Sequence, residues 1–152
     1  MKISTCMKRN VISIGETATV REAAAVFAKE HVGLLPIVDE QNKLVGVIGL
    51  RDLISLELPD FIRFVADVDF VHDFGAVENT RPDPEVLDQS ITLLMKPAIT
   101  VHADSGLLRT YALMLQHQLH DIPVISSAEQ LVGMASRVDI GTAIVSMWSE
   151  AE

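Results

Sequence analysis

Two stretches of the sequence decide the fold: Leu131-Val132-Gly133-Met134-Ala135-Ser136-Arg137-Val138-Asp139 and Leu44-Val45-Gly46-Val47-Ile48-Gly49-Leu50-Arg51-Asp52. They align when the sequence is shifted by 87 positions, and the same shift aligns residues 12–53 with residues 99–140 without a gap. Ile12 then meets Ile99, and Pro36 meets Pro123. A repeat of this length indicates two copies of one supersecondary unit.

Each copy has the same predicted order of elements. A short strand is followed by an amphipathic helix, two strands and a closing helix, in the first copy over residues 11–14, 20–31, 35–38, 43–48 and 50–58. In the second copy the corresponding ranges are 98–101, 106–117, 122–125, 130–135 and 137–148. Thr19 and Glu22 predict a capping box at the start of the first helix, and Gly33 predicts a left-handed residue at its end.

The pattern predicts an α/β (α+β) fold of two pseudo-symmetric β-α-β-β-α repeats packed sheet to sheet, because each unit leaves one apolar face to bury. Symmetry also predicts two equivalent clefts between the halves. We expect a first repeat over residues 1–58, a connecting segment over 59–90 and a second repeat over 91–152. In the connecting segment we expect a linker helix from Pro84 to Met95, and residues 60–74 could form another short helix.

Composition limits the class of protein. The formal net charge is −9, which opposes binding to nucleic acid or to an anionic membrane. The 49% of apolar residues is high for a chain of this size and predicts a buried oligomer interface, most simply a homodimer. The single cysteine, Cys6, excludes an intrachain disulfide and is expected to pack against apolar residues. Without an apolar segment resembling a signal peptide or a membrane span, the chain is expected to be cytoplasmic.

The start of the last helix is the best candidate for binding chemistry. Unpaired backbone N–H groups at a helix start suit a phosphate, and Ser136 and Arg137 add donors there. Asp139 lies one turn into the helix, where its carboxylate could accept both hydroxyls of a ribose. The pattern also fits a plain capping arrangement that satisfies only the helix itself. Asp52 keeps the carboxylate in the first copy although Gly49 has replaced the capping hydroxyl, which favours the binding interpretation.

These features together resemble the CBS domain. The similarity rests on the pattern Gly-x-x-Ser/Thr-x-x-Asp after an apolar-Pro-Val strand, complete in the second copy and kept in the first except for Gly49, and on the segment Leu94-Met95-Lys96-Pro97-Ala98-Ile99-Thr100-Val101. The resemblance covers roughly residues 7–58 and 91–148. It implies a tandem pair, often called a Bateman module, which usually dimerises and in many members binds AMP, ADP, ATP or S-adenosylmethionine between the repeats.

Carried over by position, the resemblance implies nucleotide-binding roles for Thr100, His120, Pro123, Val124, Ser136, Arg137 and Asp139 and, in the first repeat, for Ser13, Ile37, Arg51 and Asp52. Asp139 and Asp52 would hold ribose, and Ser136 and His120 would contact phosphate. Thr100 and Val124, with Ser13 and Ile37 as first-repeat equivalents, would lie beside adenine. Because Gly49 and Gly33 replace polar residues in the first repeat, we expect the second-repeat site to bind better.

The expected function is therefore a regulatory, ligand-sensing module for an adenosine nucleotide, with AMP or ADP favoured over ATP or S-adenosylmethionine. The chain is expected to be no enzyme, to require no cofactor and to hold no metal, because no nucleophile is visibly paired with a base and no metal-ligand spacing occurs. Two alternatives remain: an interaction module that dimerises with empty clefts, and a subunit that awaits a catalytic partner. The candidate dimer or partner surface is the connecting segment together with Ile140, Ile144, Met147 and Trp148.

Overall fold

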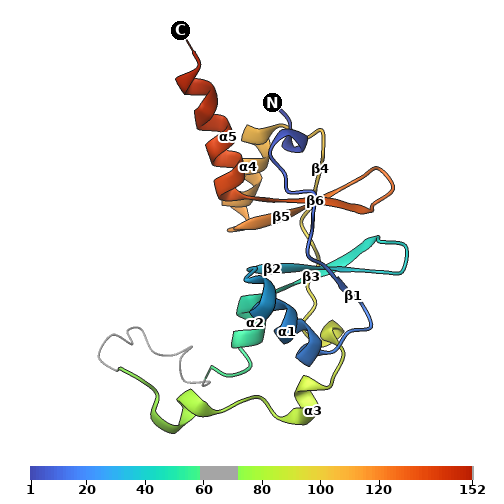
Figure 1. Cartoon of the computed structure of the whole chain (residues 1–152), viewed down its shortest axis with the longest axis vertical. Coiled ribbons are helices and arrows are strands. Elements are labelled where there is room, and N and C mark those ends of the chain that lie inside the picture. The colour runs from blue at the N-terminus through green and yellow to red at the C-terminus, as the bar shows by residue number, and fades with distance from the viewer. Residues whose placement is uncertain (59–71, 152) are drawn as a thin grey trace.

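The computed structural model describes residues 1–58 and 72–151 of the chain. It consists of two halves that lie one after the other along the long axis of the molecule, each with a three-stranded sheet and its own helices (Figure 1). The predicted α/β fold of two β-α-β-β-α repeats is therefore confirmed.

The elements of the first repeat are β1 (Ile14–Gly15), α1 (Val20–Glu30), β2 (Leu34–Val38), β3 (Leu44–Gly49) and α2 (Leu50–Ile54). Strand β2 is central in the sheet, parallel to β1 and antiparallel to β3. Helix α1 begins at the predicted capping box, in which Thr19 Oγ1 accepts the Glu22 N–H and Glu22 accepts the Thr19 N–H. Its buried positions Val20, Ala23 and Phe27 recur at helical spacing, and Ala23 and Phe27 belong to the hydrophobic core of this half.

The second repeat has the same order: β4 (Val101–His102), α4 (Leu107–Gln116), β5 (Asp121–Ile125), β6 (Leu131–Ser136) and α5 (Arg137–Ser149). Strand β5 is central, parallel to β4 and antiparallel to β6. Both hairpins carry a register irregularity at equivalent places, after Ile37 and after Val124. The two sheets are thus built to one plan, as the sequence repeat predicts.

The hairpins of the two halves contact each other at their turns. The Leu44 N–H donates to Glu129 O at 3.2 Å, and the Leu131 N–H donates to Asn42 O at 3.0 Å. Asn42 and Glu129 both have left-handed backbone, with φ of 61° and 63°. These reciprocal bonds join the two hairpins side by side, as Figure 1 shows.

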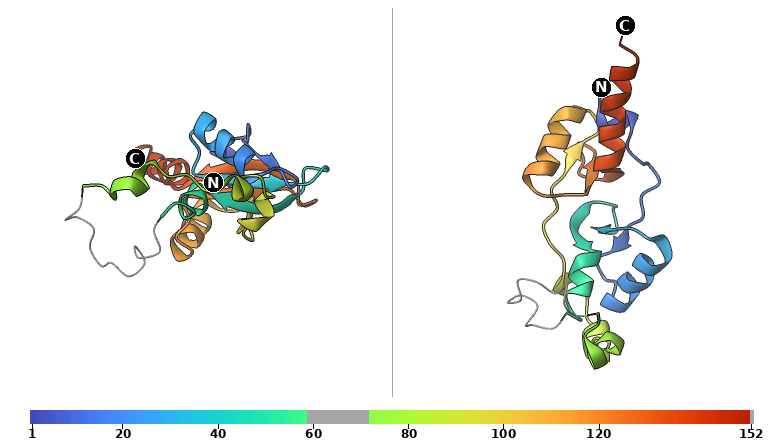
Figure 2. Two further views of the ribbon diagram at one scale, coloured as in Figure 1. Left: turned by 90° about the horizontal axis from the view of Figure 1, so that it is seen from below. Right: turned by 90° about the vertical axis from the view of Figure 1, so that its left-hand side faces the viewer.

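The segment that leads into each repeat packs on the other repeat. Ile3 and Met7 are buried in the core of the second half, and the Ile3 N–H donates to Ser105 O at 2.9 Å. In return, Ile91 is buried in the core of the first half, and its N–H donates to Ala18 O at 2.9 Å. The right-hand view of Figure 2 shows the blue and the yellow segments crossing between the halves on opposite sides of the molecule. Each hydrophobic core therefore depends on residues that belong to the other repeat.

Cys6 lies in this exchanged segment. It is half-buried and packs against the second core, which confirms its predicted packing role. Burial, with a smaller effect of the nearby Asp139 carboxylate, raises the pKa of its thiol. A thiol of this kind stays protonated and behaves as a small apolar side chain.

The end of helix α1 differs from the prediction. The left-handed residue is His31, with φ of 53°, and not Gly33. The His31 N–H donates to Phe27 O at 3.0 Å, which ends the helix two residues before the glycine. Gln118 has the same conformation, with φ of 55°, at the equivalent place after α4. The turn that leads from helix to central strand is therefore conserved between the two halves without glycine.

The predicted linker helix from Pro84 to Met95 is wrong. Helix α3 covers only Pro84–Leu87, followed by a separate 3₁₀ turn at Ile91–Leu93. The backbone between them pairs with the first repeat instead, because Gln89 O accepts the Val20 N–H at 2.9 Å and Ser90 forms a β-bridge with Thr19. Tertiary pairing thus overrides the local helical pattern.

Three further boundaries differ from the predictions. Helix α2 ends at Ile54 rather than at residue 58, because the following turns use tighter i to i−3 bonds such as Leu56 N–H to Leu53 O. Strands β1 and β4 begin three residues later than expected, since only their last residues pair with the central strand. The predicted helix over residues 60–74 lies almost wholly outside the described residues. In the described part of the chain, none of the helices combines the length and hydropathy needed to cross a bilayer.

Candidate functional site

Two clefts lie between the halves, one at the start of each closing helix, as symmetry predicts. The Asp139 cleft, of about 340 Å³, is lined by Lys8, residues 10–12, residues 31–34, Asp121, Met134, Ser136 and Asp139. The Asp52 cleft, of about 410 Å³, is lined by Gly33, Leu34, Val47, Gly49, Arg51, Asp52, Lys96, Pro97, Ile99, residues 118–121 and Pro123. Both volumes suit a small molecule.

Each cleft combines residues of both repeats. The Asp139 cleft takes the start of α5 from the second repeat and residues 8–12 and 31–34 from the first. The Asp52 cleft takes the start of α2 from the first repeat and residues 118–121 from the second. This mixing follows from the exchange of leading segments, because Lys8 pairs with Met134 and Lys96 pairs with Val47 through backbone β-bridges. A ligand in either cleft would contact both halves of the molecule.

The start of helix α5 fixes the orientation of Asp139. The Asp139 N–H donates to Ser136 Oγ at 3.0 Å, and the Ser136 N–H donates to Asp139 Oδ2 at 3.1 Å. This capping box confirms the capping part of the prediction. Oδ1 of Asp139 has no hydrogen-bond or ion-pair partner among residues 1–58 and 72–151. The carboxylate is therefore held by one oxygen, while the other keeps its acceptor capacity in a side chain that lines the cleft.

At the start of helix α2, the equivalent carboxylate, Asp52, has different partners. Asp52 Oδ2 accepts the Gly49 N–H at 2.8 Å, so Asp52 caps its helix without a hydroxyl at position 49. Capping alone thus accounts for a carboxylate at position 52, and the expectation that Asp52 favours the binding interpretation is wrong. Its other oxygen, Oδ1, forms an ion pair with Lys96 Nζ. Both oxygens of Asp52 are thus satisfied by the protein.

Asp121 is a half-buried carboxylate between the two clefts. It begins β5 and pairs in register with Ser136 on β6. Its Oδ2 lies 3.6 Å from the place where Gly33 would carry a Cβ, so it sits over the first repeat. Burial raises the pKa of Asp121, Asp139 raises it further, and the charges of His120 and Lys8 lower it. The position equivalent to Asp121 in the first repeat is the apolar Leu34.

The structure divides the predicted site residues between the two clefts. Ser136 and Asp139 line the Asp139 cleft. Arg51, Asp52, His120 and Pro123 line the Asp52 cleft. His120 therefore lies with the carboxylate of the first repeat, whereas position in the repeat had grouped it with Asp139.

Five other predicted residues line neither cleft. Ile37 and Val124 are fully buried in the centres of β2 and β5. Ser13 is exposed and Thr100 is half-buried, each just before the short first strand of its repeat. Arg137 places Nη2 2.7 Å from Nδ1 of His120 and lines a separate hollow beside helix α5.

Sequence reasoning missed two cationic or titratable residues of the Asp139 cleft, Lys8 and His31. A signal for Lys8 was present, because Met7-Lys8 in the first leading segment corresponds to Met95-Lys96 in the second. His31 gave no signal of its own, since it lines the cleft only because it takes the left-handed position after α1.

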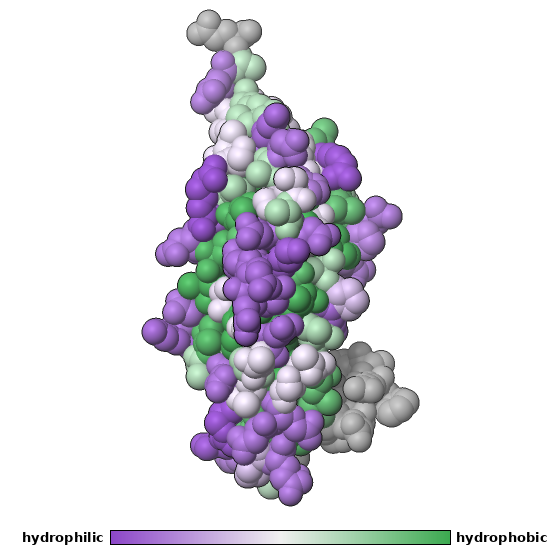
Figure 3. Space-filling view, turned by 90° about the vertical axis from the view of Figure 1, so that its right-hand side faces the viewer, coloured by the Kyte–Doolittle hydropathy of each residue, from purple (hydrophilic) through white to green (hydrophobic). Residues whose placement is uncertain are grey.

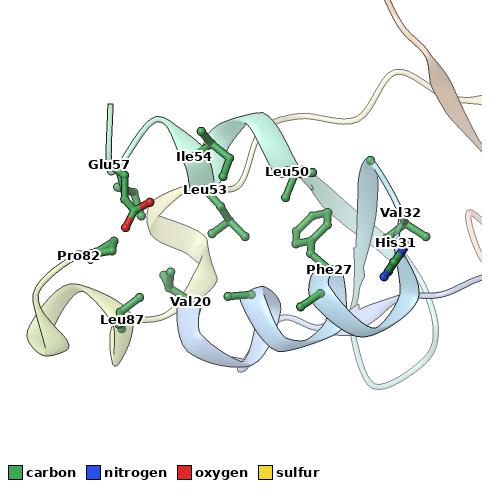
Figure 4. A pocket seen from close by; sticks show the side chains of 14 residues that line it. Val20, Phe27, His31, Val32, Leu50, Leu53, Ile54, Glu57, Pro82 and Leu87 are labelled. Carbon is green, nitrogen blue, oxygen red and sulfur yellow. The ribbon is translucent and has the colours of Figure 1, made fainter. Parts of the chain in front are cut away.

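An apolar hollow of about 700 Å³ lies outside the clefts, between α1, α2 and the segment before the second repeat. Figure 4 shows Phe27, Leu50 and Leu53 directed into it, with Val20 and Leu87 at the far end. His31 and Glu57 are the titratable side chains in its lining. Such a lining offers few hydrogen-bond donors for a phosphate or a ribose, so this hollow is not the candidate nucleotide site.

Large hydrophobic side chains remain exposed on the second repeat. Val138, Leu108 and Trp148 have 75%, 72% and 70% of their surface exposed. Ile140 is fully buried in the core, so its predicted place on an interaction surface is wrong, whereas Met147 is exposed. The face that carries the hairpin turns has a polar centre bordered on both sides by hydrophobic residues (Figure 3). Large hydrophobic side chains that gather on a surface mark a candidate interaction site.

The family model of the CBS domain matches residues 3–58 and 89–146. A curated relative, an uncharacterized protein of Methanocaldococcus jannaschii, is 26% identical over 140 residues, which are 91% of this chain and 31% of the relative. The chain thus spans about a third of the length of this relative, and less than two thirds of the other curated relatives that follow it.

Solved structures share the fold over nearly the whole chain. A CBS domain protein from Pyrobaculum aerophilum, complexed with AMP, has a TM-score of 0.72 and 24% identity, covering 99% of this chain and all of that one. The CBS domain pair of protein MJ0100, in complex with 5′-methylthioadenosine and S-adenosylmethionine, has a TM-score of 0.70 and 20% identity and covers 97% of this chain and 98% of that one. With two matched CBS models, two equivalent sheets and two clefts between them, the chain belongs to the CBS domain family as a tandem CBS pair.

Proposed function

We propose that this CBS pair is a regulatory module that binds an adenosine-containing nucleotide in the clefts between its repeats. The observation that supports it best is the geometry of Asp139. One carboxylate oxygen is held by the Ser136 N–H, and the other points to no partner among the described residues while the side chain lines a cleft of about 340 Å³. A fixed carboxylate with free acceptor capacity suits the two hydroxyls of a ribose.

AMP and ADP are the favoured ligands, with ATP and S-adenosylmethionine as further candidates. A phosphate needs cationic donors, and the Asp52 cleft provides Arg51, Lys96 and His120 in its lining. A chain of three phosphates would want more cations than these. The related structures bound to AMP and to S-adenosylmethionine support the adenosine class of ligand.

A bound ligand would signal by changing how the two halves are placed relative to each other. Since each cleft is lined by both repeats, a bound ligand would stabilise one relative placement of the halves over others. We further propose that the chain forms a homodimer through its exposed hydrophobic residues and that a protein partner reads the dimer geometry. The proposal assigns the chain no catalytic chemistry of its own.

A second candidate function is a dimerisation module with empty clefts. It is favoured by the ion pair between Lys96 and Asp52, which satisfies one of the two ribose-binding candidates without any ligand. Under this alternative the clefts would be structural, and adenosine ligands would leave the protein unchanged.

Ligand binding separates the two functions. AMP, ADP, ATP and S-adenosylmethionine would be compared by thermal shift and isothermal titration calorimetry on the full chain. Ligand at about 100 times its dissociation constant adds roughly 2.7 kcal/mol to stability. For this size of chain that is a rise of several degrees, at about 2–4 °C per kcal/mol.

Asp139→Asn and Asp52→Asn each remove a cleft charge while keeping a capping oxygen, and Asp104→Asn removes an exposed charge that lines neither cleft. At least one ligand should bind the wild type and the Asp104→Asn control, and be lost in one of the cleft variants. No shift with any ligand would establish the empty module instead.

A further inference from the structure

Lys8 and Lys96 hold equivalent places in the two halves. Each lies in the leading segment of one repeat and bonds to the last strand of the other: the Lys8 N–H donates to Met134 O at 2.8 Å, and the Lys96 N–H donates to Val47 O at 2.8 Å. Each lysine also lines one of the two clefts. Because the two backbones are bonded alike, the difference between the lysines lies in their side chains.

The side chains of the two lysines have different partners. Nζ of Lys96 forms an ion pair with Oδ1 of Asp52, whose other oxygen accepts the Gly49 N–H at 2.8 Å. In the part of the chain that the structure describes, no ion pair joins Lys8 to Asp139. The Asp52 side chain is only 15% exposed, so water has little access to the carboxylate that Lys96 neutralises.

Asp121 gives a physical reason for this difference. It lines both clefts, and burial raises its pKa, but of the two lysines only Lys8 is close enough for its charge to lower that pKa. The position equivalent to Asp121 in the first repeat is the apolar Leu34. Lys8 therefore has Asp121 as a nearby counter-ion, whereas the carboxylate that neutralises Lys96 is Asp52.

An ammonium group competes with the hydroxyls of a ribose for a carboxylate oxygen. A charged donor forms a stronger hydrogen bond to a carboxylate than a neutral hydroxyl does. A ligand that is to bind Oδ1 of Asp52 must therefore displace Lys96 or share the oxygen with it, whereas Oδ1 of Asp139 has no such partner among the described residues. The cost is greatest for a ligand without an anionic group, because it offers the displaced ammonium no new partner.

We infer that Lys96 competes with ligand for the Asp52 carboxylate, so that the Asp139 cleft fills first and the Asp52 cleft binds fully only once Lys96 has left. Lys96 acts through Asp52 and is thus a positioning residue. Its effect should weaken as the salt concentration rises, since its side chain is 63% exposed and salt screens an exposed charge. The inference rests on the proposed function, because it ranks the affinities of the two proposed sites.

Adenosine is the probe, because it has the ribose but no charge of its own. It would be titrated by calorimetry into the full chain with Asp139→Asn, which leaves the Asp52 cleft intact. Adding Lys96→Met, of similar length without the charge, should raise the affinity for adenosine at least about threefold, within the range for an ion pair with one exposed partner. Added sodium chloride should likewise strengthen binding to the Asp139→Asn chain and leave binding to the double variant unchanged.

The matched control is Lys8→Met in the full chain with Asp52→Asn. It removes the same charge at the equivalent place of the other cleft, and it should not raise the affinity for adenosine. The salt series needs only the Asp139→Asn chain, so it tests the inference even where Lys96→Met does not fold.

The outcomes separate the inference from the proposed function. An affinity for adenosine that neither Lys96→Met nor salt raises, or an equal gain from Lys8→Met, would overturn the inference. Binding of AMP by the wild type, without binding of adenosine by any of these variants, would overturn it as well. Absence of binding by every adenosine ligand to the wild type would instead overturn the proposed function.

Discussion

Met95 lies directly against the backbone of Gly46: a Cβ at position 46 would be 2.5 Å from Cγ of Met95 and 2.9 Å from the carbonyl oxygen of Lys96. The equivalent contact in the other half is between Gly133 and Met7, with a Cβ 2.6 Å from the sulfur and 3.2 Å from Lys8 O. Both glycines thus let the leading segment of one repeat lie flat on the last strand of the other.

Gly46→Ala should destabilise the fold by about 1–3 kcal/mol, the usual cost of overpacking. Gly133→Ala should cost less, because its closest contact is the flexible end of Met7 and its backbone neighbour is further away. Chemical denaturation would measure both. The control is Gly15→Ala, where nothing lies within 4 Å of the added carbon, and a loss there equal to that of Gly46→Ala would contradict the contact argument.

Asp121 predicts a specific pH dependence of stability. Its folded-state pKa is raised above the ordinary 3.8, first by burial and then by Asp139, against the lowering effects of His120 and Lys8. The folded protein therefore holds the proton more tightly than the unfolded chain, and stability falls as pH rises from about the ordinary value through the folded-state pKa.

Asp121→Asn should remove this fall in stability with rising pH. The difference in unfolding free energy between Asp121→Asn and wild type should favour the variant at neutral pH and shrink towards zero as the pH falls below 3.8. Urea denaturation at a series of pH values measures it. A difference that stays constant across the series would show that Asp121 carries no such penalty.

Gln118 has a left-handed backbone, with φ of 55°, that glycine adopts without cost. Gln118→Gly should therefore stabilise the protein by up to about 1 kcal/mol, which is a rise in Tm of roughly 2–4 °C. The matched control is Ala112→Gly in the exposed middle of α4, which should destabilise by about 1 kcal/mol. A Tm lower for Gln118→Gly than for the wild type would contradict the expected stabilisation.

The exposed hydrophobic residues of the second repeat predict self-association. Leu108 and Trp148 are 72% and 70% exposed and line the same surface hollow. Leu108→Glu should shift a homodimer towards monomer in sedimentation velocity experiments without lowering stability. Leu93→Glu is the control, because Leu93 is 54% exposed but lies in the 3₁₀ turn whose Ile91 is buried in the core of the first half. A wild-type chain that sediments as a monomer at all concentrations would exclude the proposed dimer.

Local patterns predicted the order of elements because each is encoded within a few residues. The capping pairs Thr19–Glu22 and Ser136–Asp139 form as the sequence indicates. The linker helix was predicted from the same kind of pattern and is wrong, since Gln89 and Ser90 pair with residues about 70 positions earlier in the chain. The exact end of α1 was missed because a histidine, not the glycine, takes the left-handed position.

The candidate site could be predicted only in part for the same reason. Ser136 and Asp139 lie at a helix start that can be read from the sequence, and both line a cleft. Which side chains line the cleft with them depends on how the two halves pack together. The crossing of the leading segments places Lys8 beside Met134, and His120 lines the cleft of Asp52 instead. No local pattern carries that information.

The exchange of leading segments has a consequence for the biosynthesis of the chain. Ile3 is synthesised well before the residues with which it shares the second core, among them Met114, Ile122 and Ile140. The first core can close once Ile91 has emerged from the ribosome, but the second must wait for Ile140, with Ile3 and Met7 unburied in the meantime. The second half is therefore expected to fold after the first, although two of its core residues are made before either half is complete.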